Sequence, residues 1–110
     1  MTPCDTCTGR TRMVHGDGPK PCRFLAIGEA PGKEEDRGGR PFIGPSGMEF
    51  NEGYLRLAGL HRDDIFVTNT RKCRPDNNRK PTDREAVSCA SHHLHAEIAA
   101  VQPEIVFLLG

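Results

Sequence analysis

Short apolar runs and amphipathic stretches alternate along the chain, and this alternation predicts its secondary structure. Strands are expected at residues 23–28, 64–69 and 104–109, where apolar residues are almost continuous, as in strands that are buried on both faces. Helices are expected at residues 46–58 and 82–102, each of which is followed by a Gly or a Pro. The order β-α-β-α-β predicts an α/β fold, a parallel sheet with helices on its faces.

Each predicted helix opens with a capping-box pattern, Ser46 with Glu49 and Thr82 with Glu85. Apolar residues then recur three and four positions apart, so each helix is expected to bury one face. These apolar positions are Phe50, Tyr54 and Leu57 in the first helix and Val87, Ala90, Leu94, Ile98 and Val101 in the second.

The loop at residues 28–45 follows the first strand and combines glycines, prolines and acids. Ligands of parallel α/β sheets bind beyond the carboxyl ends of the strands, so this loop is expected to form half of a ligand site. Gly28 and Gly32 let the backbone approach a ligand closely, and Phe42 offers a flat face. Carboxylates that could accept protons or orient water are Glu29, Glu34, Glu35 and Asp36. The alternative is a solvated acidic loop with Phe42 tucked into the core.

The loop at residues 69–81 follows the second strand and is basic. The Asn69 amide carries both a donor and an acceptor, so it could read a carbonyl and a neighbouring N–H together. Cations that could hold phosphates are Arg71, Lys72, Arg74, Arg79 and Lys80. The alternative is a charge run that only faces solvent.

Composition narrows the class of protein. The chain has 110 residues, of which 35% are hydrophobic and none is Trp, so it is expected to form one domain with a lean core that a metal or cluster would help to stabilise. A net charge of zero gives no sign of nucleic-acid binding by the chain as a whole. The sequence contains no 18-residue apolar run and no apolar leader, which predicts a cytoplasmic protein without a membrane span.

The five cysteines therefore read more naturally as metal ligands than as disulfides. Cys4 and Cys7 form a Cys-x2-Cys pair, and Cys73 and Cys89 could complete four thiolates for zinc or a [4Fe–4S] cluster. Spacing alone favours zinc. His92, His93 and His95 could replace a cysteine, although solvent-facing side chains are the simpler interpretation, and Cys22 is expected to be a buried apolar thiol.

Three stretches together resemble the iron–sulfur branch of the uracil-DNA glycosylase superfamily, families 4 and 5. They are GEAPGKEEDRGGRPFIGPSG at 28–47, VTNTRKCRPDNNRKPTDREAVSC at 67–89 and IAAVQPEIVFLLG at 98–110. With the Cys4–Cys7 pair the resemblance runs from end to end. It implies a three-layer α/β/α sandwich and a [4Fe–4S] cluster held by Cys4, Cys7, Cys73 and Cys89, with zinc as the alternative.

The resemblance also implies roles for the loop residues. Phe42 would stack on a uracil flipped out of DNA, and Asn69 would bind the uracil edge and reject cytosine. Glu29, with the backbone of the Gly28–Pro31 segment that includes Ala30, would line the pocket and position water. Glu35 or Asp36 would assist near the sugar. Phosphate contacts would come from Arg71, Lys72, Arg74, Arg79 and Lys80.

The resemblance is to only part of a family member. Such proteins are roughly twice as long, and their His-Pro-Ser-type motif, which follows the third strand, is absent from this sequence. The expectation is a single incomplete domain at residues 1–110, with a cysteine-bearing arm at 1–22 and a core at 23–110, truncated after the third strand. It would excise uracil once a second chain or segment completes the fold. The alternative is a non-catalytic module that binds DNA, uracil or protein.

Overall fold

The computed structural model of the chain describes residues 13–74, 84, 87, 89 and 93–109. The elements in these residues are β1 (Phe24–Gly28), α1 (Lys33–Gly38), α2 (Pro45–Glu49), the π-helical segment η1 (Phe50–Tyr54), α3 (Leu55–Leu57), the 3₁₀ turn η2 (Arg62–Asp64), β2 (Ile65–Asn69), α5 (His95–Val101) and β3 (Ile105–Leu108). No helix in this part of the chain is long and apolar enough to cross a membrane.

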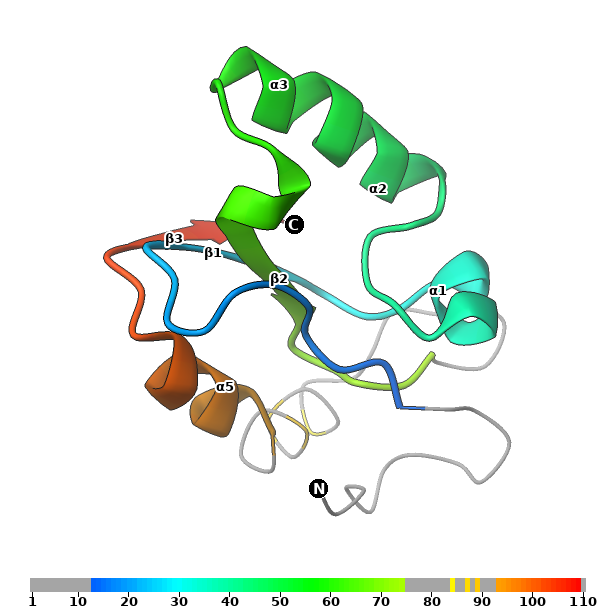
Figure 1. Ribbon diagram of the computed structural model, residues 1–110. Coiled ribbons are helices and arrows are strands. Elements are labelled where there is room, and N and C mark those ends of the chain that lie inside the picture. Colours follow the sequence, from blue (N-terminus) through cyan, green and yellow to red (C-terminus); the bar gives the residue numbers. More distant parts are fainter. Residues whose placement is uncertain (1–12, 75–83, 85–86, 88, 90–92, 110) are drawn as a thin grey trace.

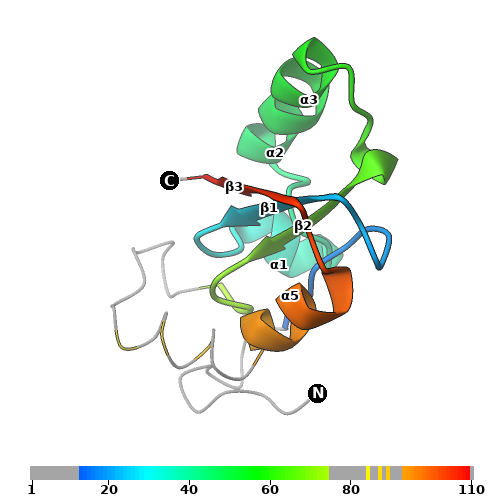
Figure 2. The same ribbon diagram turned by 90° about the vertical axis from the view of Figure 1, so that its left-hand side faces the viewer.

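The three strands form a parallel sheet in the order β2-β1-β3. The continuous rod of α2, η1 and α3 lies on one face of the sheet and α5 lies on the other (Figures 1 and 2). This arrangement confirms the predicted α/β fold with helices on both faces. Gly28 and Asn69 are paired in the register of β1 and β2, so the two polar loops leave the sheet side by side.

The core is split between the two faces because side chains alternate along β1. Leu25 and Ile27 pack with Phe66 of β2 on the face that α5 covers; Leu94 and Val101 complete this cluster. Ala26 points the other way, into a cluster with Phe50, Leu55, Ile65 and Val67. All residues of β1 except Phe24, and all residues of β2, are buried, as their almost continuous apolar sequences predict.

The first long helix differs from its prediction in where it begins and in which face it buries. Its N-cap is Gly44 rather than Ser46, and no side chain caps it. Phe50 is buried, but Tyr54 and Leu57 are 62% and 87% exposed, and Leu55 is buried instead. The π-helical segment explains the shift, because its wider turn places the next buried residue five positions after Phe50 rather than four.

Helix α1 lies inside the stretch at residues 28–45, which the sequence predicts to be a loop. Its first turn carries Glu34, Glu35 and Asp36, whose charges favour a helix N-terminus. Gly39 ends the helix in the left-handed conformation, with φ of 75°. Three of the four acids that were candidates for ligand contact therefore stabilise the start of a helix.

The second predicted helix is described in part, as α5. Leu94 and Val101 are buried as expected, whereas Val87 is 67% exposed and does not join the buried stripe. Thr82 and Ala90 lie outside the described residues. Gly59 does end the first helix, with a left-handed φ of 75°.

Candidate functional site

A pocket of about 660 Å³ opens at the carboxyl ends of all three strands. Gly28 of β1, Asn69 of β2 and Leu108 of β3 contribute to its floor, and one wall comes from α2 and η1. The loop after β1 supplies Glu29, Ala30 and Phe42. The sequence predicted this location, because both unusual loops follow strands whose ends meet at one edge of the sheet.

Gly28 is the point at which two predicted binding residues meet. A Cβ atom built on Gly28 would collide with Oδ1 of Asn69 and lie 3.1 Å from the ring of Phe42. The Asn69 side chain is itself buried, with 3% exposed. The glycine therefore leaves a flat backbone surface between an amide and an aromatic ring, which suits a planar ligand with polar edges.

Phe42 adopts a left-handed backbone conformation, with φ of 59°, that is uncommon for a residue with a side chain. Its ring meets Phe50 edge to face, with centroids 5.1 Å apart and planes at 83°. The main chain of Phe42 packs against Gly47 of α2, where an added Cβ would collide with it. Helix α2 can therefore approach this loop so closely only because position 47 is glycine.

Glu35 ties together the two ends of the loop after β1. Its Oε1 accepts the Gly32 N–H at 3.0 Å, and its Oε2 accepts the N–H groups of Ile43 and Gly44 at 2.9 and 2.5 Å. A carboxylate makes stronger hydrogen bonds than a neutral acceptor, so Glu35 holds the two ends of the loop together. It also lines the pocket, but its oxygens are already engaged with three backbone donors.

The other two predicted acids differ in position. Glu29 is exposed and lines the pocket at the end of β1, where a carboxylate can orient water. Asp36 lies on α1 and is not among the residues that line the pocket. Of these two acids, only Glu29 is part of the pocket lining.

Comparisons with known proteins identify the family of the chain. The sequence profile of the Uracil DNA glycosylase superfamily matches residues 15–110. The chain belongs to this superfamily. It is 43% identical over 109 residues to the type-4 uracil-DNA glycosylase of Thermotoga maritima, covering 99% of the chain and 56% of that protein.

Two further type-4 uracil-DNA glycosylases of the superfamily show a similar likeness. The chain is 40% identical to that of Sulfurisphaera tokodaii and 41% identical to that of Pyrobaculum aerophilum, with 97% of the chain covered in both. These alignments cover 48% and 55% of the relatives. The chain thus spans about half the length of the curated glycosylases it matches.

Lys72 does not face solvent, and its predicted contact with DNA phosphate is wrong. Its side chain is fully buried, and its Nζ lies 2.5 Å from Oε1 of Glu97. The same Nζ donates to the Thr68 hydroxyl at 2.6 Å and to the Asn69 carbonyl at 2.5 Å. Burial lowers the pKa of Lys72, and the Glu97 carboxylate opposes that shift. A basic loop pattern cannot distinguish an exposed lysine from one that folds back onto a buried acid.

The remaining predicted phosphate ligands have different outcomes. Arg71 is 2% exposed and its Nε donates to the Cys73 carbonyl at 3.2 Å, so its assignment to surface phosphate is also wrong. Arg74 is half-buried. Arg79 and Lys80 lie outside the described residues, and for them the phosphate role stays a prediction.

Glu97 is the residue that sequence reasoning missed. Besides Lys72, it accepts the Thr68 hydroxyl at 2.8 Å through Oε1 and the Gly16 N–H at 2.8 Å through Oε2. Its position offered a signal, because it lies three residues after Leu94 and four before Val101, on the buried face of the helix. An acid within an apolar stripe needs a buried partner.

Two of the four predicted cluster ligands lie in the described part of the chain. Cys73 and Cys89 are fully buried, and the Lys72 N–H donates to Sγ of Cys89 at 3.0 Å. A cysteine sulfur ligates a metal as the thiolate. Cys4 and Cys7 lie outside the described residues. Among the residues that the structure describes, no group of three or more His, Cys, Asp or Glu could hold a metal.

The last predictions to compare with the structure concern the histidines and Cys22. His93 is buried and its ring meets His15 edge to face, with centroids 6.1 Å apart, so it is not the solvent-facing residue that was expected. His95 is exposed, and His92 lies outside the described residues. Cys22 is half-buried against the core, and its thiol donates to the Asp64 carbonyl at 3.3 Å.

Proposed function

We propose that the chain supplies the base-binding part of a uracil-DNA glycosylase, which flips uracil out of DNA and hydrolyses its N-glycosidic bond. The observation that carries this proposal is the convergence of Gly28, Phe42 and Asn69 on one pocket at the strand ends. An enzyme acting on a base must take that base out of the stack and hold it in such a pocket.

Each residue has a distinct task in this proposal. The Phe42 ring stacks on the base, and Gly28 gives the base a flat surface to lie against. The Asn69 amide accepts from N3–H of uracil and donates to O4. Cytosine presents the opposite pattern of an N3 acceptor and an N4 donor, so a fixed amide rejects it.

Bond cleavage leaves negative charge on uracil and positive charge on the sugar. The Asn69 amide N–H stabilises the uracil anion through a hydrogen bond aimed at the growing charge. Glu29, exposed at the pocket and next to Gly28, stabilises the cationic sugar and orients the attacking water. Arg74, Arg79 and Lys80 are proposed to contact DNA phosphates, which position the strand without reading its sequence.

A second segment or a second chain is proposed to complete the fold beside β3. All four residues of β3 are exposed, from 40% for Ile105 and Phe107 to 77% for Leu108, whereas every residue of β2 is buried. An edge strand with apolar residues on both faces needs a cover. Relatives about twice as long as the chain have the residues to supply one.

A [4Fe–4S] cluster is proposed at Cys4, Cys7, Cys73 and Cys89, with zinc as the alternative. The full burial of Cys73 and Cys89 and the N–H donated to the Cys89 sulfur fit a buried thiolate centre, in which hydrogen bonds to sulfur tune the group. Such a centre would tie residues 1–12 to the loop after β2. Visible absorption separates the two metals, since zinc has no d–d or charge-transfer band there.

The proposed activity can be tested by complementation. The chain is mixed with the C-terminal half of a type-4 relative, and formation of abasic sites in a uracil-containing oligonucleotide is measured. We expect excision from the mixture and none from either part alone, and Asn69→Ala is expected to abolish it. If folded mixtures bind the oligonucleotide without cutting it, the non-catalytic binding module is the better account. Absence of both binding and excision contradicts each account.

A further inference from the structure

The left-handed conformation of Phe42 must be held by its surroundings. A residue with a side chain loses about 1–2 kcal/mol in this region of backbone space, and such strain persists only where neighbouring contacts impose it. Among the described residues, Gln102 is the other non-glycine residue with a positive φ, and it ends α5. Phe42, by contrast, lies at the pocket.

Arg62 contacts the carbonyl groups on both sides of the Phe42 Cα. Its Nη2 donates to the Pro41 carbonyl at 2.6 Å, and its Nη1 donates to the Phe42 carbonyl at 3.3 Å. These two carbonyls belong to the peptide planes that define φ and ψ of Phe42, so the guanidinium fixes the conformation directly. Its Cζ also lies 5.8 Å from the centre of the Phe42 ring, within range of a cation–π contact.

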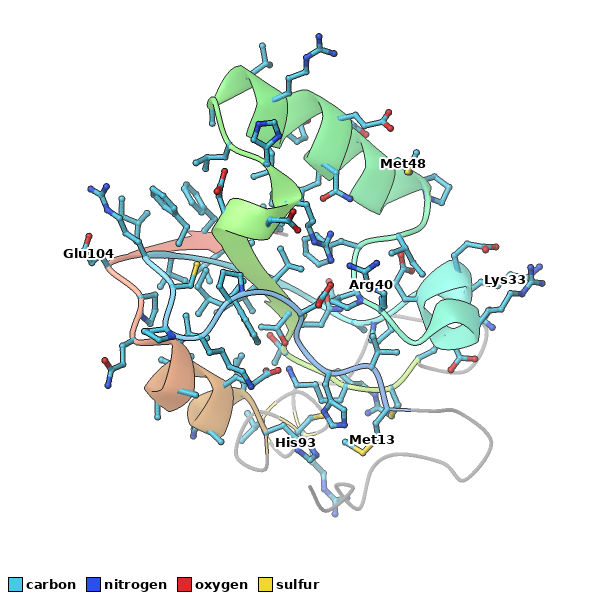
Figure 3. All side chains as sticks on the ribbon, in the orientation of Figure 1. Met13, Lys33, Arg40, Met48, His93 and Glu104 are labelled. Atoms are coloured by element: carbon cyan, nitrogen blue, oxygen red, sulfur yellow. The ribbon has the colours of Figure 1, made fainter. Side chains whose placement is uncertain are left out.

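Neighbouring side chains hold the guanidinium in turn. Asn51 of η1 accepts from Nη1 of Arg62 at 3.0 Å, and its own amide donates to the Phe42 carbonyl at 3.1 Å. Asp17 lies 3.7 Å from Nη2 of Arg62 and also accepts from Arg40 at 2.6 Å. Arg40 is labelled in Figure 3. The Arg62 side chain is only 18% exposed, which makes its hydrogen bonds stronger than those of a solvated pair.

We propose that Arg62 is a positioning residue that holds the Phe42 ring across the pocket from Asn69. The planar guanidinium fork can donate to two carbonyls at once, which a lysine ammonium cannot do with the same geometry. This inference rests on the proposed function, since a fixed ring orders a base only if the pocket receives one. The ring itself is set by Arg62 whatever the ligand is.

The contact between the Phe42 and Phe50 rings reports the conformation without any ligand. Nuclear Overhauser effects between the two rings are measured in the full chain, in Arg62→Ala, in Arg62→Lys and in Arg56→Ala. Arg56 is an exposed arginine on α3 and serves as the control. We expect the ring contact in the full chain and in Arg56→Ala, and its loss in both Arg62 variants. A folded Arg62 variant that keeps the contact overturns the proposal, and Arg62→Lys remains informative if Arg62→Ala does not fold.

A double-mutant cycle then tests whether Arg62 acts through Phe42. Free uracil is titrated into each variant while the fluorescence of Tyr54 is followed; Tyr54 lines the pocket, and the chain has one Tyr and no Trp. Arg62→Ala is expected to weaken uracil binding about tenfold or more, the effect of losing a charge-assisted hydrogen bond. In a Phe42→Ala background the same change is expected to have almost no effect. Additive effects overturn the positioning role. A wild-type chain that binds no uracil contradicts the proposed function, and the ring contact then decides the role of Arg62.

Discussion

Replacing Gly28 by alanine is expected to lower uracil excision by the complemented chain at least about 100-fold, the loss that a misplacement of about 1 Å can cause. The new methyl group would collide with Oδ1 of Asn69 and press on the Phe42 ring at 3.1 Å. Asn69 is almost fully buried and has little room to retreat. The amide and the ring would therefore be pushed apart where a base is proposed to lie.

Gly53→Ala is the matched control for this prediction. A Cβ on Gly53 meets no atom within 4 Å, and the residue lies within η1, so alanine there is expected to leave excision unchanged. It is also expected to stabilise the helix by about 0.5–1 kcal/mol. The measurements are initial rates of abasic-site formation and midpoints of thermal unfolding. Equal activity in Gly28→Ala and Gly53→Ala would contradict the placement of the base over Gly28.

Replacing Glu97 by glutamine is expected to lower the free energy of unfolding by about 3–5 kcal/mol, because it leaves the buried Lys72 ammonium without its counter-charge. Lys72 and Glu97 are 0% and 8% exposed, and their charged atoms are 2.5 Å apart. Replacing both residues at once, as Lys72→Met with Glu97→Leu, is expected to restore part of the stability, because no charge is then left buried, although the Gly16 N–H and the Asn69 carbonyl lose a partner.

Glu104→Gln provides the control for Glu97→Gln. Glu104 pairs with Arg23 at 2.7 Å, but the two side chains are 69% and 65% exposed, and such surface pairs contribute about 0–1 kcal/mol. Urea unfolding of the variants measures the difference. If Glu97→Gln and Glu104→Gln are equally stable, then the Lys72–Glu97 pair does not support the fold in the way its burial indicates.

Elements set by periodicity could be predicted from the sequence. The almost continuous apolar runs of β1 and β2 predicted buried strands, and the two polar loops that follow them predicted a ligand site with Gly28, Phe42 and Asn69. Backbone geometry alone brings Gly28 and Asn69 to one edge of the sheet, whereas the position of Phe42 at the pocket depends on how the loop after β1 folds.

Features that depend on a specific partner could not be predicted. Lys72 has the same local sequence context as an exposed lysine, and only its contact with Glu97, 25 residues away in the chain, decides that it is buried. Glu35 is one of several acids in its loop, and its three backbone hydrogen bonds require the folded loop to exist. The π-helical turn that exposes Tyr54 leaves no mark in the apolar spacing of its helix.

The central claim is that the pocket at the strand ends selects uracil through Asn69 and Phe42. The most direct test is to titrate the chain with free uracil and, separately, with cytosine. The signals followed by NMR are the backbone amides of Gly28 and Asn69 and the side-chain amide of Asn69. We expect uracil to shift both sets of signals saturably and cytosine to leave them unchanged, since its donor and acceptor are reversed. Equal responses to the two bases, or shifts confined to residues away from Gly28 and Asn69, would contradict the account.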